Sequence, residues 1–285
     1  MKPKILVVDG YASEARAELV AGGARMASDL YVEMLEKCWP GARCDVLFPS
    51  DTDEPIHERI DLGALDAVAW TGCSLTIYDD DPRVHRMLAL AKAAYAAGVP
   101  SFGSCWGAQV AVVAAGGRVA KNPNGREMGL ARKIQLTDEG RGHPFYAGKP
   151  SVFEGFISHE DEITHLPPGA VCLAANHFTR VQAVAVTHGP GSFWALQYHP
   201  EYDVHELARL TFCRIDKLIK KGFFVDRTAA LDYVDKLETL HQEPGRTDLG
   251  WLLAIDADVQ NEDIRLREVR NWLEYLVLPT MMRRR

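Results

Sequence analysis

The stretch from Val99 to Ala115 constrains the fold of this chain more than any other. An apolar run with β character ends in Gly103-Ser104-Cys105-Trp106-Gly107, and a helical pattern then continues to Ala115. A cysteine at the apex of a strand, turn and helix, with a glycine two residues to either side, has the geometry of a nucleophile elbow. The glycines let strand and helix approach closely, and the positive end of the helix favours the reactive thiolate. We therefore predict Cys105 as a nucleophile rather than a small core residue.

Short apolar runs alternate with helical patterns through the first part of the chain. We predict buried strands at residues 4–8, 43–48, 66–70 and 99–104, and helices at 24–37 and 82–97. This alternation predicts a doubly wound, mostly parallel α/β sheet of the flavodoxin-like kind. The polar stretch 9–23 is longer than most connections, and we predict it as a loop. It either borders the active site or is a solvated insertion.

The pattern changes after Gly116-Gly117. Short β segments are predicted at residues 118–120, 131–136, 171–175, 183–187 and 193–198, and the chain beyond Val204 is predominantly helical. Two amphipathic helices are predicted at 227–240 and 263–278. We divide the chain into a domain of residues 1–221 and a helical C-terminal extension of residues 222–285. We expect the extension to pack against the domain. The alternatives are that it forms a homodimer interface or binds a partner protein.

Charge and cysteine usage limit the class of protein. A net charge of −7 argues against nucleic acid or an anionic membrane as the main partner. The chain has no apolar run of about 18 residues, and its first residues read as a strand rather than a signal peptide. Its six cysteines form no CxxC pair, which is typical of reduced thiols in a cytoplasm. We expect a cytoplasmic protein without a bound metal or cofactor.

The segment Tyr198-His199-Pro200-Glu201 places a histidine at a predicted strand end, with a carboxylate two residues on. A cysteine nucleophile needs a base, and the base needs a group that holds it in one tautomer. We predict His199 as the base and Glu201 as its partner, although a surface His-Pro-Glu turn is the alternative. The backbone N–H groups of Trp106 and Gly72 are the candidates for stabilising an oxyanion.

Taken together, the cysteine elbow, Gly116-Gly117 and the His-Pro-Glu segment resemble the class I glutamine amidotransferases. The similarity is greatest to the amidotransferase domain of GMP synthase. Two further stretches, Asn124–Gly129 and Ile157–Ile163, resemble that domain's Arg-Glu-aromatic-Gly and Ser-His-Gly-Asp segments. The resemblance covers about residues 4–203.

This resemblance implies that Cys105 forms a γ-glutamyl thioester and releases ammonia from glutamine, while His199 moves the protons and Glu201 orients it. The groups that it places near the α-amino and α-carboxyl groups of glutamine are Gln109 and the backbone of Ser158, His159 and Glu160. The chain contains no pyrophosphatase or Walker-type loop. A separate ATP-dependent synthase is therefore the expected recipient of the ammonia.

Two departures from the family pattern fall where substrate would be held. The usual Gly-Gly-Pro loop is here Thr71-Gly72-Cys73-Ser74-Leu75, and Glu160 stands in place of a glycine. These changes favour a second reading, a γ-glutamyl hydrolase or peptidase that acts on other γ-glutamyl compounds. In that reading Glu160 lines a widened pocket. With free glutamine as substrate, the Glu160 charge must be turned away or paired, and Arg126 is the candidate partner. A binding module without activity is disfavoured, because all three triad residues are present.

Overall fold

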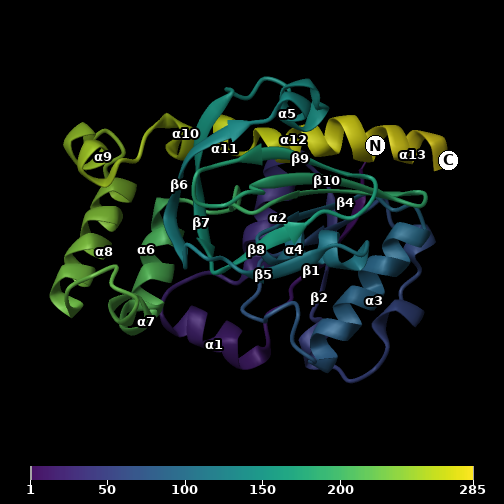
Figure 1. The fold of residues 1–285 in the computed structure, drawn as a ribbon, viewed down its shortest axis with the longest axis horizontal. Helices are drawn as coiled ribbons and strands as arrows, with labels where there is room; N and C mark the ends of the chain where they lie inside the picture. The colour runs from purple at the N-terminus through teal and green to yellow at the C-terminus, as the bar shows by residue number, and fades with distance from the viewer. Residues whose placement is uncertain (1, 285) are drawn as a thin grey trace.

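The computed structural model describes residues 2–284 and contains a large central sheet with helices on both faces (Figure 1). The strands are β1 (Lys4–Val8), β2 (Arg43–Leu47), β3 (Ala67–Trp70), β4 (Ser101–Ser104), β5 (Arg118–Lys121), β6 (Glu127–Leu136), β7 (Val152–His159), β8 (Asp161–His165), β9 (Ala170–Ala175), β10 (Ala183–His188) and β11 (Gly191–Leu196). Nine of them form one sheet in the order β2-β1-β3-β4-β11-β10-β9-β6-β7, and β5 pairs with β8 separately.

The first five strands in this order run parallel, and they form the half of the sheet that carries the elbow. Their apolar runs are buried on both faces: Ile5 and Val7 pack on one side, and Leu6 and Val8 on the other. The carboxyl ends of parallel strands meet at one edge, so the residues after β3, β4 and β11 come together there. The predicted flavodoxin-like α/β fold is confirmed.

The remaining four strands of the sheet are antiparallel. Sequence analysis predicted strands within β9, β10 and the second half of β6, but it missed β7 and β8. The end of β7 approaches the parallel half, because the His199 N–H donates to the carbonyl of Phe156 at 2.8 Å. The motif residues 157–163 thereby reach the carboxyl edge of β4 and β11.

Helices cover both faces of the sheet. They are α1 (Ser13–Ala21), α2 (Ala27–Cys38), α3 (Pro82–Ala96), α4 (Trp106–Ala114), α5 (Asp138–Gly142), α6 (Val204–Cys213), α7 (Ile215–Lys220), α8 (Arg227–Gln242), α9 (Thr247–Leu253), α10 (Ala257–Gln260), α11 (Glu262–Arg265), α12 (Arg267–Trp272) and α13 (Leu278–Arg284). Apolar residues of α3 and α4 pack on one face, while those of α2, α12 and α13 pack on the other.

Two helical segments differ from the sequence-based expectation. The stretch predicted as a loop contains α1, and Leu19 is the one buried residue of that helix. An apolar stripe was therefore not present in the sequence to reveal it. The helix predicted over residues 263–278 is divided into α11, α12, a π-helical turn (Leu273–Val277) and the start of α13.

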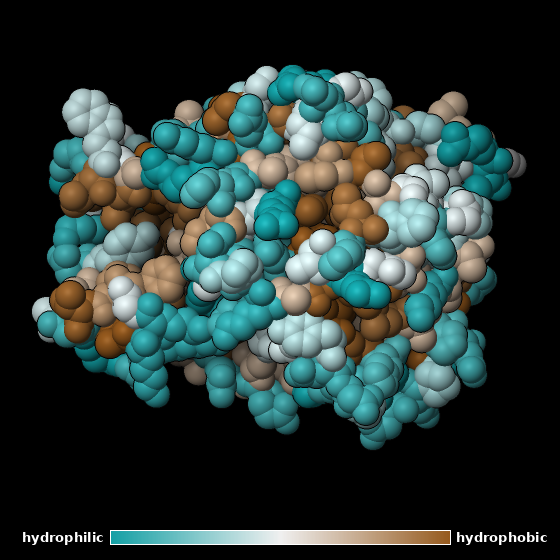
Figure 2. All heavy atoms as spheres, viewed as in Figure 1, coloured by the Kyte–Doolittle hydropathy of each residue, from teal (hydrophilic) through white to brown (hydrophobic). Residues whose placement is uncertain are grey.

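The C-terminal helices contribute to the main core. Trp272 of α12 is fully buried, and its ring centroid lies 5.5 Å from that of Phe102 on β4. At the other end of the molecule α8 packs against α6. Phe223 and Val225, in the connection from α7 to α8, are exposed, and Figure 2 shows apolar surface at this end of the molecule. The division at residue 221 stays a prediction. Within residues 2–284, no helix has both the length and the apolar character needed to cross a bilayer.

Candidate active site

Cys105 lies at the apex between β4 and α4, with φ 53° and ψ −105°. Its backbone N–H donates to the Leu196 carbonyl at 2.7 Å, which ties the turn to β11. A Cβ on Gly103 would lie 2.9 Å from the Gly107 Cα, and a Cβ on Gly107 would lie 2.7 Å from the Trp70 carbonyl oxygen. Both glycines are therefore required for the strand and helix to approach this closely.

His199 follows β11 and is buried beside Cys105. Its Nδ1 lies 2.6 Å from the Glu201 Oε1, and the Tyr202 ring stacks on the imidazole with centroids 3.9 Å apart. Burial lowers the pKa of His199, but the Glu201 carboxylate and Cys105 outweigh burial and raise that pKa to about 9. The imidazole thus interacts with both the cysteine and the carboxylate, which is the arrangement that moves a proton to and from a nucleophile.

Two residues that sequence analysis did not identify hold Glu201 in place. The Ser104 hydroxyl donates to the Glu201 Oε1 at 2.9 Å, and the Ser104 backbone N–H donates to the Tyr31 hydroxyl oxygen at 2.9 Å. Tyr31 in turn donates to the Trp70 carbonyl at 2.8 Å. The carboxylate is therefore fixed by a chain of hydrogen bonds that reaches β3.

The two oxyanion candidates lie at the same edge of the sheet. A Cβ added to Gly72 would lie 3.0 Å from the His199 Cε1 and 3.7 Å from the Cys105 Cβ, so this glycine is packed directly against both residues. Trp106 is the first residue of α4, and an N–H at that position has no acceptor within its own helix.

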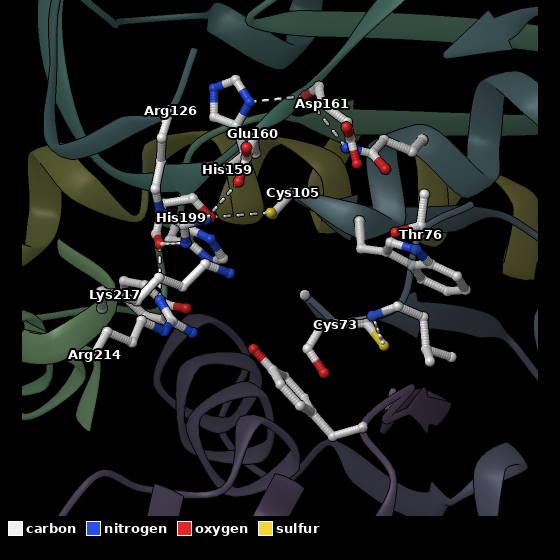
Figure 3. Close-up of a pocket in the computed structure, with 18 residues that line it drawn as sticks. Cys73, Thr76, Cys105, Arg126, His159, Glu160, Asp161, His199, Arg214 and Lys217 are labelled. Carbon is white, nitrogen blue, oxygen red and sulfur yellow. Dashed lines mark hydrogen bonds and ion pairs between the residues drawn. The ribbon is translucent and has the colours of Figure 1, made fainter. Parts of the chain in front are cut away.

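The cavity above Cys105 has walls of different character (Figure 3). Arg126, Arg214 and Lys217 line one side, and Cys73 and Thr76 line the other. Sequence analysis did not identify Arg214 or Lys217, because no local motif marks a residue that reaches the site from the junction of α6 and α7.

All four residues that the resemblance placed near the substrate border this cavity. They are Gln109, Ser158, His159 and Glu160. The Gln109 Nε2 donates to the Asp161 carbonyl at 3.4 Å, whereas its buried Oε1 has no hydrogen-bond partner within residues 2–284. The Ser158 carbonyl oxygen lies 3.8 Å from the Cys105 Sγ.

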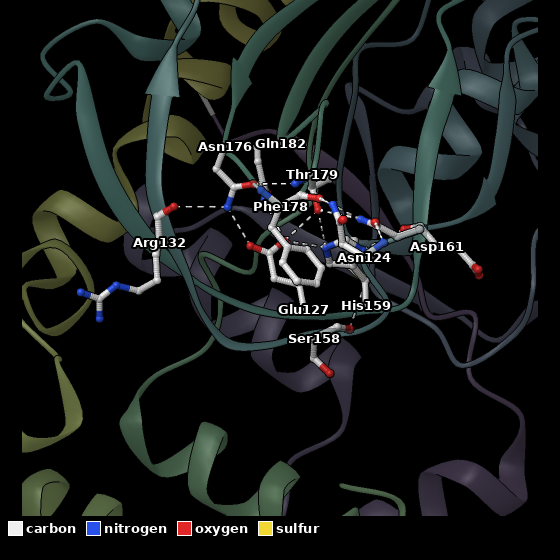
Figure 4. A network of polar contacts seen from close by, with 12 residues as sticks. Asn124, Glu127, Arg132, Ser158, His159, Asp161, Asn176, Phe178, Thr179 and Gln182 are labelled. Carbon is white, nitrogen blue, oxygen red and sulfur yellow. Dashed lines mark hydrogen bonds and ion pairs between the residues drawn. The ribbon is translucent and has the colours of Figure 1, made fainter. Parts of the chain in front are cut away.

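The His159 imidazole belongs to a buried polar network (Figure 4). Its Nδ1 lies 2.8 Å from the Asp161 carbonyl and its Nε2 lies 3.0 Å from the Glu127 Oε2. Thr179 and Gln182 also donate to that carboxylate oxygen. Burial raises the pKa of Glu127, but the hydrogen bond from His159 and its other partners outweigh it and lower that pKa. Both ring nitrogens of His159 lie against oxygen atoms, and these two contacts fix the turn from β7 to β8.

The Glu160 charge is paired. Its carboxylate lies 2.6 Å from the Lys221 Nζ, 3.3 Å from the Lys121 Nζ and 3.7 Å from the Arg126 Nη1. The hydrogen bond from Lys221, with the further contribution of Lys121, outweighs partial burial and lowers the pKa of Glu160 to about 2. The pairing with Arg126 that the sequence analysis considered is present, and two lysines join it.

His205, on α6, pairs with Glu238, at 2.7 Å between Nδ1 and Oε2. Nowhere in residues 2–284 do three or more His, Cys, Asp or Glu side chains gather in a set that could hold a metal ion.

Comparisons with known proteins agree with this fold and identify the family of the chain. The family described as Glutamine amidotransferase class-I matches residues 72–213. The chain is 32% identical to the γ-glutamyl-L-1-hydroxyisopropylamide hydrolase of a Pseudomonas species, over 99% of this chain and 96% of that protein. It is 30% identical to the glutamine-hydrolyzing GMP synthase of Thermotoga maritima, over 64% of this chain but only 33% of that protein. A solved glutamine amidotransferase from Thermotoga maritima has the same fold, with a TM-score of 0.66 and 19% identity over 97% of this chain and 99% of that one.

The chain belongs to the class I glutamine amidotransferase family, and it is an enzyme of the cysteine amidohydrolase type. The resemblance inferred from the sequence is confirmed. The match to the class I family ends at residue 213, whereas the match to the Pseudomonas hydrolase spans nearly the whole chain. The similarity between this chain and the Pseudomonas hydrolase thus includes the helices beyond α6.

We expect Gly72→Ala to lower kcat/KM for amide hydrolysis by about 100-fold, because the added methyl group displaces the His199 ring from its position against Cys105. Steady-state kinetics of the purified variant measure this effect. Gly142→Ala is the matched control, since a Cβ there would meet nothing within 4 Å. Equal kcat/KM values for the two variants would show that Gly72 does not position the histidine.

Proposed function

We propose that this enzyme hydrolyses a small γ-glutamyl amide through a thioester on Cys105. The single observation that carries the proposal is the position of the His199 imidazole, which interacts with both Cys105 and Glu201 on the floor of a cavity. This is the set of groups that acyl transfer from an amide requires: a nucleophile, a proton carrier and a group that orients the carrier.

In the first half of the proposed reaction the Cys105 Sγ attacks the carbonyl carbon of the γ-amide. A carbon–sulfur bond forms, and the negative charge that develops on the oxygen is stabilised by the N–H groups of Gly72 and Trp106. The carbon–nitrogen bond then breaks. His199 gives its proton to the departing nitrogen, so the amine leaves neutral and the γ-glutamyl thioester remains.

In the second half a water molecule attacks the thioester. His199 takes a proton from the water, the carbon–sulfur bond breaks, and the sulfur leaves as the thiolate. The product is glutamate with a free γ-carboxylate. Glu201 stays ionised throughout and stabilises the imidazolium that alternates with the neutral ring.

The choice of substrate rests on which relative the chain matches from end to end. The Pseudomonas relative is named a hydrolase of a γ-glutamyl amide, and the match includes the C-terminal helices as well as the class I segment. The departures noted at Gly72 and Glu160 support the same choice, because both border the cavity that would hold the substrate.

A second candidate is a glutamine amidotransferase that delivers ammonia to a separate ATP-dependent synthase. The match to the GMP synthase of Thermotoga maritima favours it, since that protein is named as glutamine-hydrolyzing. The two candidates share the thioester chemistry. They differ in the leaving group, which is ammonia in one and a substituted amine in the other.

Hydrolysis of a defined set of amides tests the proposal. The set contains glutamine, γ-glutamyl-L-1-hydroxyisopropylamide, γ-glutamylethylamide and, as a control without the γ-glutamyl group, N-ethylacetamide. We expect glutamate release from a substituted γ-glutamyl amide with kcat/KM at least about tenfold above that for glutamine, a difference of about 1.4 kcal/mol. A preference for glutamine would establish the second candidate, and no glutamate from any compound would overturn both.

A further inference from the structure

Two guanidinium groups converge on one neutral hydroxyl group near Cys105. The Arg126 Nη2 lies 2.9 Å from the Ser158 Oγ, and the Arg214 Nη1 lies 2.7 Å from the same atom. Both guanidinium groups donate, so the Ser158 oxygen accepts twice and its own proton remains free for a third partner. All three residues line the cavity above Cys105 (Figure 3).

In the part of the chain that the structure describes, these two guanidinium groups have a single carboxylate near them, that of Glu160, which lies 3.7 Å from the Arg126 Nη1. The Arg126 side chain is 9% exposed, and within residues 2–284 its Nε has no hydrogen-bond partner. Over the same residues, no carboxylate forms an ion pair with Arg214. Burial, and then the proximity of Arg214, lower the pKa of Arg126. Two largely desolvated guanidinium groups that share one carboxylate at 3.7 Å are incompletely neutralised, which is unfavourable, so this wall of the cavity favours a further anion.

The surrounding charges do not supply that anion. Glu160 is 3.7 Å from the Arg126 Nη1, and its carboxylate is already engaged by Lys221 and Lys121 at shorter distances. Lys217 adds a further cation to the same wall. This local excess of positive charge occurs in a chain whose net charge is −7, so it is a property of the site rather than of the composition.

We propose that Arg126 and Arg214 bind a carboxylate of the substrate and determine specificity for it. Guanidinium groups bind carboxylates through paired, charge-assisted hydrogen bonds, and the free proton of the Ser158 hydroxyl adds a third donor. The inference rests on the proposed function, because every γ-glutamyl compound carries an α-carboxylate. A γ-glutamyl amino acid carries a second carboxylate on its leaving group, and the same chemistry recognises either.

Ligand binding to Cys105→Ala protein, which does not turn substrate over, tests the inference by calorimetry. Four ligands separate the two sources of carboxylate: γ-glutamylethylamide, γ-glutamylglycine, and the derivative of each in which the α-carboxylate is a neutral carboxamide. We expect Arg214→Met to raise Kd about 10- to 100-fold for γ-glutamylethylamide and to leave its α-carboxamide derivative unchanged within about twofold. Arg214→Lys should recover part of the loss.

If the arginines bind the carboxylate of the leaving group, Arg214→Met will instead raise Kd for γ-glutamylglycine and for its α-carboxamide derivative, because both carry the glycine carboxylate. Lys220→Met is the matched control, since it removes a positive charge from an exposed position on α7 outside the cavity. Arg126→Met repeats the test if Arg214→Met does not fold. Equal effects of the arginine variants on ligands with and without carboxylates would overturn the inference. Failure of the proposed function would appear separately, as absence of hydrolysis by the unmodified enzyme.

Discussion

Replacing Cys105 with alanine is expected to lower the rate of amide hydrolysis by roughly 10⁶-fold, the loss seen when the nucleophile of a triad is removed. The sulfur forms the bond on which both halves of the proposed reaction depend, and no other group in the cavity can replace it. Alanine keeps the Cβ and the hydrogen bond from the residue 105 N–H to Leu196, so the elbow should retain its conformation. Glutamate release and the thermal melting temperature of the variant are the measurements.

Cys73 provides the control, because it lines the same cavity. Burial raises the pKa of the Cys73 thiol to about 12, although its sulfur accepts the Leu75 N–H at 3.3 Å. It is therefore protonated at neutral pH and a poor nucleophile. Cys73→Ala should retain at least partial activity. A glutamine-like electrophile should label Cys105 alone in peptide mass spectrometry; labelling of Cys73, or full turnover by Cys105→Ala, would contradict the assignment.

Local sequence was sufficient to place the elbow and the His-Pro-Glu segment in the fold. Gly103 and Gly107 mark a turn where strand and helix touch, and such a turn can be recognised within five residues of sequence. His199 and Glu201 were predicted from their position at a strand end. Parallel strands bring their carboxyl ends to one edge, so these separate predictions converge on a single site without knowledge of the tertiary contacts.

The supporting residues could not be predicted in this way. Tyr31 reaches Ser104 across 73 positions of sequence, and Arg214 reaches Ser158 across 56. From sequence alone, a tyrosine on an amphipathic helix is predicted to be a core residue, and an arginine at a helix junction is predicted to be a surface residue. Their roles depend on which side chains the completed fold brings together, and no spacing rule encodes that.

The missed elements have equally specific causes. In β7, Gly155 and the polar residues of the motif obscure the alternation typical of a strand, although residues 155–159 are buried. Gly155 is required because an added Cβ would lie 2.9 Å from the Tyr198 ring. Helix α1 has no side-chain cap and one buried residue, so the sequence predicts neither where the helix begins nor which of its faces is buried.

Replacing His199 with alanine is expected to reduce kcat by about 10³- to 10⁴-fold, because the residue handles protons in both halves of the proposed reaction. Glu201→Gln keeps the shape of the orienting group and should be milder or equal in its effect. Single-turnover measurements separate formation of the thioester from its hydrolysis. His199→Ala should slow both steps. A variant that formed the thioester at the normal rate would remove His199 from the first step.

The pH dependence of kcat/KM gives an independent test of the same histidine. The pKa of His199 is about 9, so the imidazolium that protonates the leaving amine is present below this pH and is lost above it. We expect kcat/KM to fall as the pH rises through about 9. Glu201 is one of the groups that raise this pKa, so Glu201→Gln should move the falling limb to lower pH. Glu238→Gln removes the carboxylate from a different histidine–glutamate pair, that of His205 on α6, and should leave the limb in place. If the fall of kcat/KM moved equally in Glu201→Gln and Glu238→Gln, the group that titrates would not be His199.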